Sequence, residues 1–436
     1  MKKTKTLVVA TLALLFICSR SLAQQTPPGL QALVEQAKAN YPKLKEAEAL
    51  IRANQLRVEV AKTALQPYVT GDFQYRYINP VAKATFRTPD GPQSVQFTPY
   101  SNFDLKAQGS LTVYDFGKTD AAIQRAQEDV TNAQHSLELN KHNLAYQIAQ
   151  LYYGLAYLQR SIAVQDSVLR SLGEVLQQTE FRYKNGDVLE LDLLNQQVRI
   201  ETTHNRKVDL ENQLAKQKIL LAYLTGAEAP AVDAAAVDFG TATAALTMDG
   251  LYQQAQTGNL ELAIANDRLR AAQADLIVAE HVNRPVVNLL GAAGFKNGYL
   301  PEIAVPKFNV AAGVGISAPL YSGKRYALQK QSARISYEAG QQNLAYVQNT
   351  LQKDLAMVLA DMASNRQRLT NLQTQTRQAD KALEIARTRY RYGTLTFPEL
   401  DTVQTAVEEV RLSRLSIEYS LLLNALEIKR LTGEEL

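Results

Sequence analysis

The sequence contains no tryptophan, one cysteine and four histidines among 436 residues. So few thiol and imidazole groups exclude a disulfide scaffold and give little support to a metal or redox enzyme. His135 and His142 lie seven positions apart, which is too far for a helical zinc pair, so we expect no metal site. The sequence has neither a glycine-rich phosphate loop nor a nucleophile elbow. We therefore expect no enzymatic activity and no cofactor.

The first 23 residues have the layout of a cleaved secretory signal. Lysines at the start precede the apolar run LVVATLALLFIC, and the segment ends in Ser-Leu-Ala. Cys18 follows Ile17 where lipidation requires a small residue, so we expect a mature chain without a thiol. Cleavage removes four of the 47 basic residues, and the remainder balances the 43 acidic residues. The charge therefore gives no support for nucleic-acid binding, and the signal predicts export from the cytoplasm.

Proline, which helix interiors exclude, is absent between Pro99 and Pro230 and between Pro319 and Pro398. Both stretches contain apolar residues at seven-residue intervals, as coiled-coil helices do. The first stretch has two such rows. One row is Ile123, Val130, Leu137, Leu144, Leu151 and Leu158, and the other is Ile148, Leu155, Ile162, Leu169 and Leu176. The second stretch has the row Leu344, Leu351, Val358, Leu372, Ala379 and Ala386. We therefore expect two long helices, 118–183 and 324–390, each roughly 100 Å long at ~1.5 Å per residue.

Four segments have the residue pattern and the length of membrane-spanning strands, namely 68–77, 103–113, 286–296 and 308–318. Each has the ~9–11 residues that cross a bilayer in a barrel, whereas no apolar run after the signal approaches the ~18 residues of a spanning helix. Alternation in the first two segments predicts that one set of side chains faces lipid: Phe73, Tyr75, Tyr77, Phe103 and Leu105. The opposite face carries Asp72, Gln74, Arg76, Asp104 and Lys106.

Four strands are too few to close a barrel, because the smallest barrels need about eight. Two copies of the chain would supply eight strands and three copies would supply twelve. A soluble β-domain with one hydrated face is the alternative.

The order of these features is duplicated. The first repeat, 24–228, contains a helix at about 29–66, two strands joined by a loop, a long helix, a glycine turn and a second helix. The second repeat, 248–436, contains the same series and begins with a helix at about 248–283. A linker, 229–247, separates them. The turn glycines, Gly186 and Gly393, lie 207 residues apart, as do the closing Leu-Thr-Gly segments, and Gly-Lys pairs precede both long helices.

The motifs NYP at 40–42, DFGKTDAA and YSGKRYAL at the strand-to-helix junctions, and two Tyr-x-x-Gly turns resemble the TolC family of outer-membrane efflux channels. The resemblance covers nearly all of the mature chain. It implies a mainly α fold with a transmembrane β-barrel: coiled-coil hairpins form a periplasmic helical tunnel, and four strands per chain close into a twelve-stranded barrel on trimerisation. It also implies location in the outer membrane and the role of exit duct in a tripartite efflux or secretion system. The implied partners are a periplasmic adaptor protein, an inner-membrane pump and outer-membrane lipid.

The two glycine turns are the expected hairpin tips, because glycine readily adopts the left-handed conformation that ends a helix. The resemblance implies that adaptor docking involves the tip residues Gly186, Asp187, Val188, Gly393, Thr394 and Leu395. It implies a gate formed by Tyr183, Asp192, Tyr390 and Glu399. The alternative is that the two acids are first-turn residues favoured by the helix dipole and that the tyrosines only pack the last turn. Asn195, Thr402 and Leu395 depart from the family pattern, so the closed state could be held differently.

A periplasmic coiled-coil adaptor is the alternative class of protein. An adaptor has one hairpin inserted into a folded domain, whereas this sequence predicts two tandem hairpins and four membrane-length strands. The sequence leaves the exported substrate open.

Overall fold

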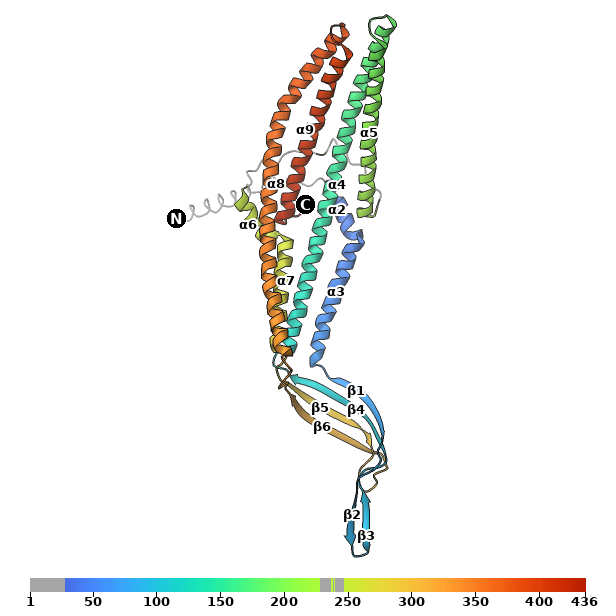
Figure 1. Ribbon diagram of the computed structural model, residues 1–436, viewed down its shortest axis with the longest axis vertical. Helices are drawn as coiled ribbons and strands as arrows, with labels where there is room; N and C mark the ends of the chain where they lie inside the picture. The colour runs from blue at the N-terminus through green and yellow to red at the C-terminus, as the bar shows by residue number, and fades with distance from the viewer. Residues whose placement is uncertain (1–27, 228–236, 238, 240–246) are drawn as a thin grey trace, which may run out of the picture. The chain divides into compact units, whose positions relative to one another are not determined.

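The computed structural model of the chain describes residues 28–227, 237, 239 and 247–436 (Figure 1). The predicted signal, 1–23, lies outside the described residues, and so does nearly all of the predicted linker, 229–247. The chain divides into two compact units, and each unit takes segments from both sequence repeats. Among the described residues, no helix combines the length and the apolar character needed to cross a membrane.

The first unit is helical and comprises described residues within 28–46, 137–262 and 347–436. Two hairpins dominate it. The first hairpin joins α4 (Lys118–Lys184) to α5 (Glu190–Thr225), and the second joins α8 (Arg325–Arg391) to α9 (Phe397–Thr432). The short helices α2 (Pro28–Asn40) and α6 (Met248–Gly258) complete the unit and contact α5 and α9 respectively. Both long helices begin and end within one residue of the predicted bounds.

The predicted heptad rows of α4 form the buried side of this helix. Leu137, Leu144 and Leu158 of the first row are buried, and so are Ile148 and Leu155 of the second. Two buried rows in different phases mean that α4 packs on neighbours along more than one side, as the sequence predicts. In α8, Leu351 and Ala386 of the predicted row are buried as well.

The two Leu-Thr-Gly segments close their hairpins in the same way. Gly226 and Gly433 end α5 and α9 with φ of 71° and 77°. The side-chain amide of Asn40 donates to the Thr225 carbonyl at 3.3 Å, and that of Asn259 donates to the Leu431 carbonyl at 3.0 Å. Asn40 is the last residue of α2 and Asn259 directly follows α6, so the duplicated sequence forms a duplicated tertiary contact.

The second unit comprises 47–136 and 263–346 and contains the sheet. It includes most of α3 (Pro42–Lys62), the following 3₁₀ turn η1 (Thr63–Leu65), most of α7 (Leu260–His281) and the first parts of α4 and α8. The four predicted strands are present as β1 (Tyr68–Tyr77), β4 (Ser101–Tyr114), β5 (Val286–Lys296) and β6 (Lys307–Ser317). They form one antiparallel sheet in the order β1-β4-β5-β6.

Three local predictions need correction. The segment expected to be one helix at 29–66 is divided into α2 and α3 at Tyr41, because Pro42 disfavours helical geometry in the preceding residue. The second such segment, 248–283, is divided at Asn259, whose ψ of 117° is extended. The expected loop between the first two strands contains a further hairpin, formed by β2 (Lys83–Thr88) and β3 (Gly91–Gln96).

The register of β1 and β4 assigns the alternating side chains to two faces. Phe73 lies opposite Leu105 and Tyr75 lies opposite Phe103, while Asp72 lies opposite Lys106. Directly opposed residues of an antiparallel pair share a face. The five aromatic and apolar residues named from the sequence therefore lie on one face, and the charged residues lie on the other. The apolar face continues on β5 and β6, where Phe295 lies opposite Phe308.

Candidate gate at the hairpin tips

Both hairpins reverse direction through the same backbone motif. In the first tip, the Gly186 N–H donates to the Tyr183 carbonyl and the Asp187 N–H donates to the Arg182 carbonyl. Gly393 and Thr394 repeat this pattern in the second tip. Gly186 and Gly393 have φ of 79° and 73°, as predicted, and this pairing of bonds is the Schellman motif that ends many helices.

The helices that follow the two turns begin differently. In α9, Glu399 accepts hydrogen bonds from the Thr396 backbone N–H at 2.8 Å and from the Thr396 hydroxyl at 2.7 Å. The first of these bonds belongs to a capping box between Thr396 and Glu399. These bonds lower the pKa of Glu399. In α5, the N-cap residue Leu189 provides no side-chain cap, and the half-buried Asp192 makes no side-chain hydrogen bond among the described residues. The two acids that the sequence pairs therefore have different local surroundings.

Tyr390 connects the two hairpins near their tips. Its side chain is 2% exposed, and its hydroxyl lies 2.5 Å from the Thr179 hydroxyl of α4. Thr179 donates its only hydroxyl proton to the Val175 carbonyl at 2.9 Å, so Tyr390 is the donor in the cross-hairpin bond. Arg182 donates to the Tyr390 carbonyl at 3.2 Å and lies 5.5 Å from the centroid of its ring. One residue thus receives polar contacts from α4 at both its side chain and its backbone.

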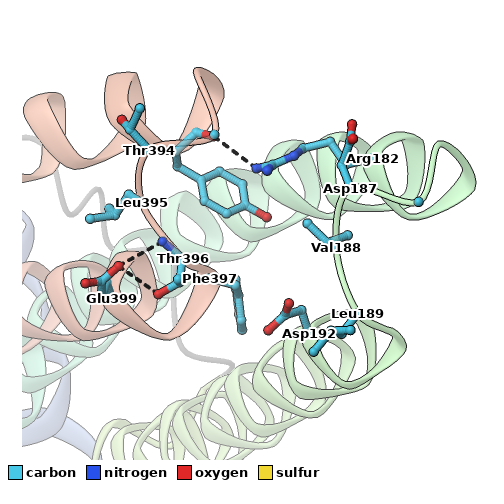
Figure 2. A pocket seen from close by; sticks show the side chains of 13 residues that line it. Arg182, Asp187, Val188, Leu189, Asp192, Thr394, Leu395, Thr396, Phe397 and Glu399 are labelled. Carbon is cyan, nitrogen blue, oxygen red and sulfur yellow. Dashed lines mark hydrogen bonds between the residues drawn. The ribbon is translucent and has the colours of Figure 1, made fainter.

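An apolar cluster surrounds the Tyr390 ring and contains Val175, Ala386, Phe397 and Leu400, with Leu395 and Val403 packed against it. Both tips also line a shallow cavity of about 430 Å³. Figure 2 shows Arg182, Asp192 and Glu399 among the residues around this cavity. Tyr390 lines it too, as do all six residues predicted for adaptor docking, namely Gly186, Asp187, Val188, Gly393, Thr394 and Leu395. Tyr183 does not line this cavity, and it is 40% exposed.

A second connection between the hairpins lies farther from the tips and centres on Glu408 of α9, which is 1% exposed. Arg199 and Arg206 of α5 approach its carboxylate at 2.6 and 2.9 Å, and the Gln165 amide of α4 donates to it at 3.0 Å. Arg199 also pairs with Asp401 at 3.0 Å. The charges of this cluster balance, and every donor to Glu408 comes from the first hairpin. We call these five residues the Glu408 cluster.

The pKa of Glu408 shows that these contacts favour its charged form. Burial raises the pKa of a carboxyl group, but the bond from Gln165 and the charges of Arg199 and Arg206 outweigh burial and lower the pKa of Glu408. Between this cluster and Tyr390, the Ser171 hydroxyl of α4 accepts bonds from Gln404 at 2.9 Å and from Arg387 at 2.5 Å. A series of polar contacts therefore joins the hairpins from the Glu408 cluster to the tips.

Sequence reasoning missed the Glu408 cluster, although one pattern was available to find it. Leu400, Gln404, Glu408 and Leu415 follow one another at helical spacing and are all buried. A charged residue on such a stripe requires a partner when it is buried. The spacing does not predict which residue that partner is, because this depends on how the two hairpins pack.

Two of the histidines make contacts that connect separate elements. His135 Nδ1 lies 2.6 Å from the carboxylate of the buried Asp267, and His281 Nδ1 lies 3.0 Å from the Gly117 carbonyl. The described residues contain no group of three His, Cys, Asp or Glu side chains that could hold a metal ion.

Two helical hairpins joined at their tips, together with an antiparallel sheet that has one apolar face, define a membrane channel subunit of the helical-duct class. The model of the outer membrane efflux protein family matches residues 33–227 and 251–434, and the chain belongs to this family. It is therefore an efflux channel protein of the outer membrane that extends into the periplasm, and the resemblance seen in its sequence is confirmed.

Relatives and solved structures agree with this assignment. The outer membrane protein TolC of Salmonella enteritidis is 22% identical over 418 residues, covering 93% of this chain and 82% of the relative. The pyoverdine export outer membrane protein OpmQ of Pseudomonas aeruginosa is 23% identical over 409 residues, covering 90% and 84%. Among solved structures, the outer-membrane channel OprN has a TM-score of 0.77 at 22% identity, covering 94% of this chain and 90% of that chain. VceC of Vibrio cholerae has a TM-score of 0.75 at 20% identity, covering 93% and 96%.

Proposed function

We propose that three copies of this chain form a closed duct that carries substrates across the outer membrane, as the exit component of a tripartite efflux or secretion system. The observation that carries the proposal is the open sheet. Among the described residues, β1 and β6 each pair on one side only, while the sheet presents a continuous apolar face. Lipid does not satisfy unpaired strand edges, so several copies must join edge to edge. Three copies would supply a twelve-stranded barrel, the number favoured by the family resemblance.

The proposed gate is the periplasmic mouth of the duct. The Tyr390–Thr179 bond and the Arg182 contacts hold the second hairpin against the first, so this mouth is narrow while they persist. Asp192 and Glu399 of each subunit would add negative charge there and attract cations. The capping box supports a structural part for Glu399, whereas the half-buried Asp192 has no such contact to explain its position. Tyr183, the counterpart of Tyr390 in the first repeat, would contribute through its exposed ring and not through its hydroxyl, which has no hydrogen-bond partner among the described residues.

The proposed partners are a periplasmic adaptor and an inner-membrane pump. The exposed tips, which both line the cavity, would receive the adaptor through the six residues from Gly186 to Val188 and from Gly393 to Leu395. The alternative of an adaptor protein is disfavoured, because the family model covers both halves of the chain. Crosslinking in cells followed by purification should recover an adaptor and a pump, and the pump's class would indicate the exported substrate. Recovery of neither partner by any tip crosslinker would contradict the tripartite assignment.

We expect the purified mature protein to have about three times the mass of its monomer in detergent. The unpaired strand edges require several copies to join, and the family resemblance favours three. Native mass spectrometry measures this mass directly. Multi-angle light scattering measures it as well, once the contribution of bound detergent has been subtracted with the refractive-index signal. A monomer that remains stable and inserted in membranes would contradict the pooled barrel, and a dimer would contradict the number three.

Single cysteines in the sheet should show which face meets lipid. The predicted mature chain has no thiol, so each engineered cysteine is the only target. A cysteine at Tyr75 or Leu105 should react with a lipid-soluble maleimide, and one at Gln74 or Lys106 should react with a membrane-impermeant maleimide admitted to the lumen. The register makes each neighbouring pair a matched control, because one residue step moves the side chain to the other face. Reversed labelling would show that the charged face meets lipid.

A further inference from the structure

The Gly-Lys pairs at the two strand-to-helix junctions are a duplicated motif that the proposed duct and gate do not use. Gly117 and Gly323 have φ of 85° and 59°, so the glycines are explained by the sharp turn from strand to helix. The lysines that follow, Lys118 and Lys324, have no such explanation. Lys118 begins α4, and Lys324 has an unusual φ of 67° directly before α8.

Basic side chains gather at this end of the sheet. Arg325 follows Lys324, and Arg284 lies between α7 and β5 with its guanidinium donating to the Phe116 carbonyl at 2.6 Å. We call Lys118, Arg284, Lys324 and Arg325 the basic belt. Arg284, Lys324 and Arg325 are exposed. Among the described residues, neither lysine of the belt forms an ion pair.

The acids near the belt do not neutralise it. Asp115 is buried and accepts bonds from the backbone N–H groups of Gly117 and Thr119 at 3.0 and 2.8 Å. Glu280 pairs with Lys330 at 2.9 Å, and the charge of Arg284 acts on it more weakly. Asp120, in the first turn of α4, is the remaining acid against four basic residues. The surface at the belt is therefore positive, and cations at helix starts do not stabilise the helices they precede.

Exposed aromatic and apolar side chains occupy the same end of the sheet. Tyr114 ends β4 opposite Val287, on the apolar face of the sheet, and it is 56% exposed. Leu320 and Tyr321, between β6 and α8, are 98% and 89% exposed. Tyrosine is typical of the border between lipid and water in outer-membrane barrels. Tyr114 continues the apolar face of the sheet up to the basic belt, and Leu320 and Tyr321 add exposed apolar surface beside it, so the belt lies where lipid headgroups would lie.

We propose that the basic belt binds the phosphate groups of anionic phospholipids in the leaflet that faces the periplasm. The leaflet follows from the proposed function, in which the helices extend into the periplasm, so this inference rests on it. Charge complementarity and continuity with the lipid-facing surface support this occupant over a protein partner. Such binding fixes the depth of the barrel at the point where each long helix begins. The same sequence motif serves both repeats because both junctions meet the same leaflet.

Native mass spectrometry of the full-length mature protein, released from detergent micelles with added phosphatidylglycerol or phosphatidylcholine, tests the proposal. The parent should retain phosphatidylglycerol about tenfold better, and 0.5 M salt should remove most of this preference. The triple variant Lys118→Gln, Lys324→Gln, Arg325→Gln should lose it. Arg284 is left in place because of its bond to Phe116. Equal retention of the two lipids by the parent would overturn the proposal.

The matched control changes the same number of charges elsewhere in the second unit, as Lys83→Gln, Arg87→Gln, Lys296→Gln, and should behave like the parent. The charge-retaining variant Lys118→Arg, Lys324→Arg, Arg325→Lys should also keep the preference, which distinguishes lost charge from lost structure. Millimolar inorganic phosphate should not compete, because the aromatic border requires a lipid. Equal loss in the control variant, or belt-dependent binding of lipopolysaccharide, would overturn the assignment to this leaflet. Mass and channel conductance, measured on the same samples, report separately whether the proposed function holds.

Discussion

Glu408→Gln is expected to lower the free energy of unfolding of the helical unit by about 3–5 kcal/mol, the typical loss when one partner of a buried ion pair is removed. Glu408 is 1% exposed and receives Arg199, Arg206 and Gln165 from the first hairpin. Glutamine has nearly the same shape, so the change removes charge without opening a cavity. The side chain of Arg199 is only 10% exposed, so its charge would lose a partner in a place that water reaches poorly. Thermal and guanidinium unfolding of the mature protein in detergent, followed by the helical circular dichroism signal, measures the loss.

The neighbouring substitution Glu409→Gln is the matched control, because Glu409 is exposed and lies on the same helix. It should change stability by no more than a few tenths of a kcal/mol, as surface substitutions usually do. A double-mutant cycle with Arg199→Met should give a coupling energy between Arg199 and Glu408 of about 1–3 kcal/mol. Equal unfolding midpoints for the Glu408 and Glu409 variants would mean that the cluster contributes nothing to holding the hairpins together.

The pH dependence of this effect has a definite sign. The pKa of Glu408 is lowered in the folded chain, so the folded state favours the carboxylate more than the unfolded state does. The resulting stabilisation is present above the pKa of the unfolded state, and it is lost as the pH falls through the folded pKa. The difference between the parent and Glu408→Gln should therefore be full at neutral pH and shrink on acidification.

The long helices and strands could be predicted because their causes are local or periodic. Proline-free stretches with seven-residue rows specified α4 and α8 to within one residue. Alternation located β1 and β4, and strands of similar length located β5 and β6, where alternation is weaker. The break at Tyr41 was also available, since Pro42 restricts its predecessor. The β2–β3 hairpin was missed because its strands have only six residues each, although Pro89-Asp90-Gly91 is a common turn sequence.

The candidate gate also has a part that the sequence predicts and a part that depends on tertiary packing. The left-handed glycines of the tips follow from backbone sterics, so sequence alone predicted them. Tyr390 and Tyr183 occupy equivalent places in the two repeats, yet only Tyr390 is buried against the other hairpin. The difference comes from Thr179 and Arg182 of α4, which reach Tyr390 only after the hairpins pack. Sequence equivalence therefore predicted the backbone of the tips, and tertiary packing determined which tyrosine connects the two hairpins.

Tyr390→Phe is expected to raise the resting conductance of the reconstituted channel severalfold while the oligomer remains intact. The change removes one hydroxyl, and with it the 2.5 Å bond that joins the second hairpin to Thr179 of the first. Thr179 keeps its bond to the Val175 carbonyl, so no buried donor is left without a partner. The aromatic ring still fills the apolar cluster with Phe397 and Leu400. The stability loss should therefore stay near the ~0.5–1.5 kcal/mol of an ordinary hydrogen bond.

Conductance responds more strongly than stability because the lost bond lies beside the tips, where a small separation of the hairpins widens the mouth. Thr179→Val removes the same hydrogen bond by deleting the other hydroxyl, and it should raise conductance by a similar factor. The double variant with both substitutions should conduct little more than either single variant. Tyr183→Phe deletes an equivalent hydroxyl from the exposed tyrosine of the first tip, whose side chain forms no hydrogen bond among the described residues, and its conductance should stay close to that of the parent. Single-channel recording in planar bilayers, with the mass of each variant measured in parallel, separates gating from assembly. Parental conductance in both Tyr390→Phe and Thr179→Val would show that this bond is helix-end packing, and the constriction would then have to lie elsewhere along the duct.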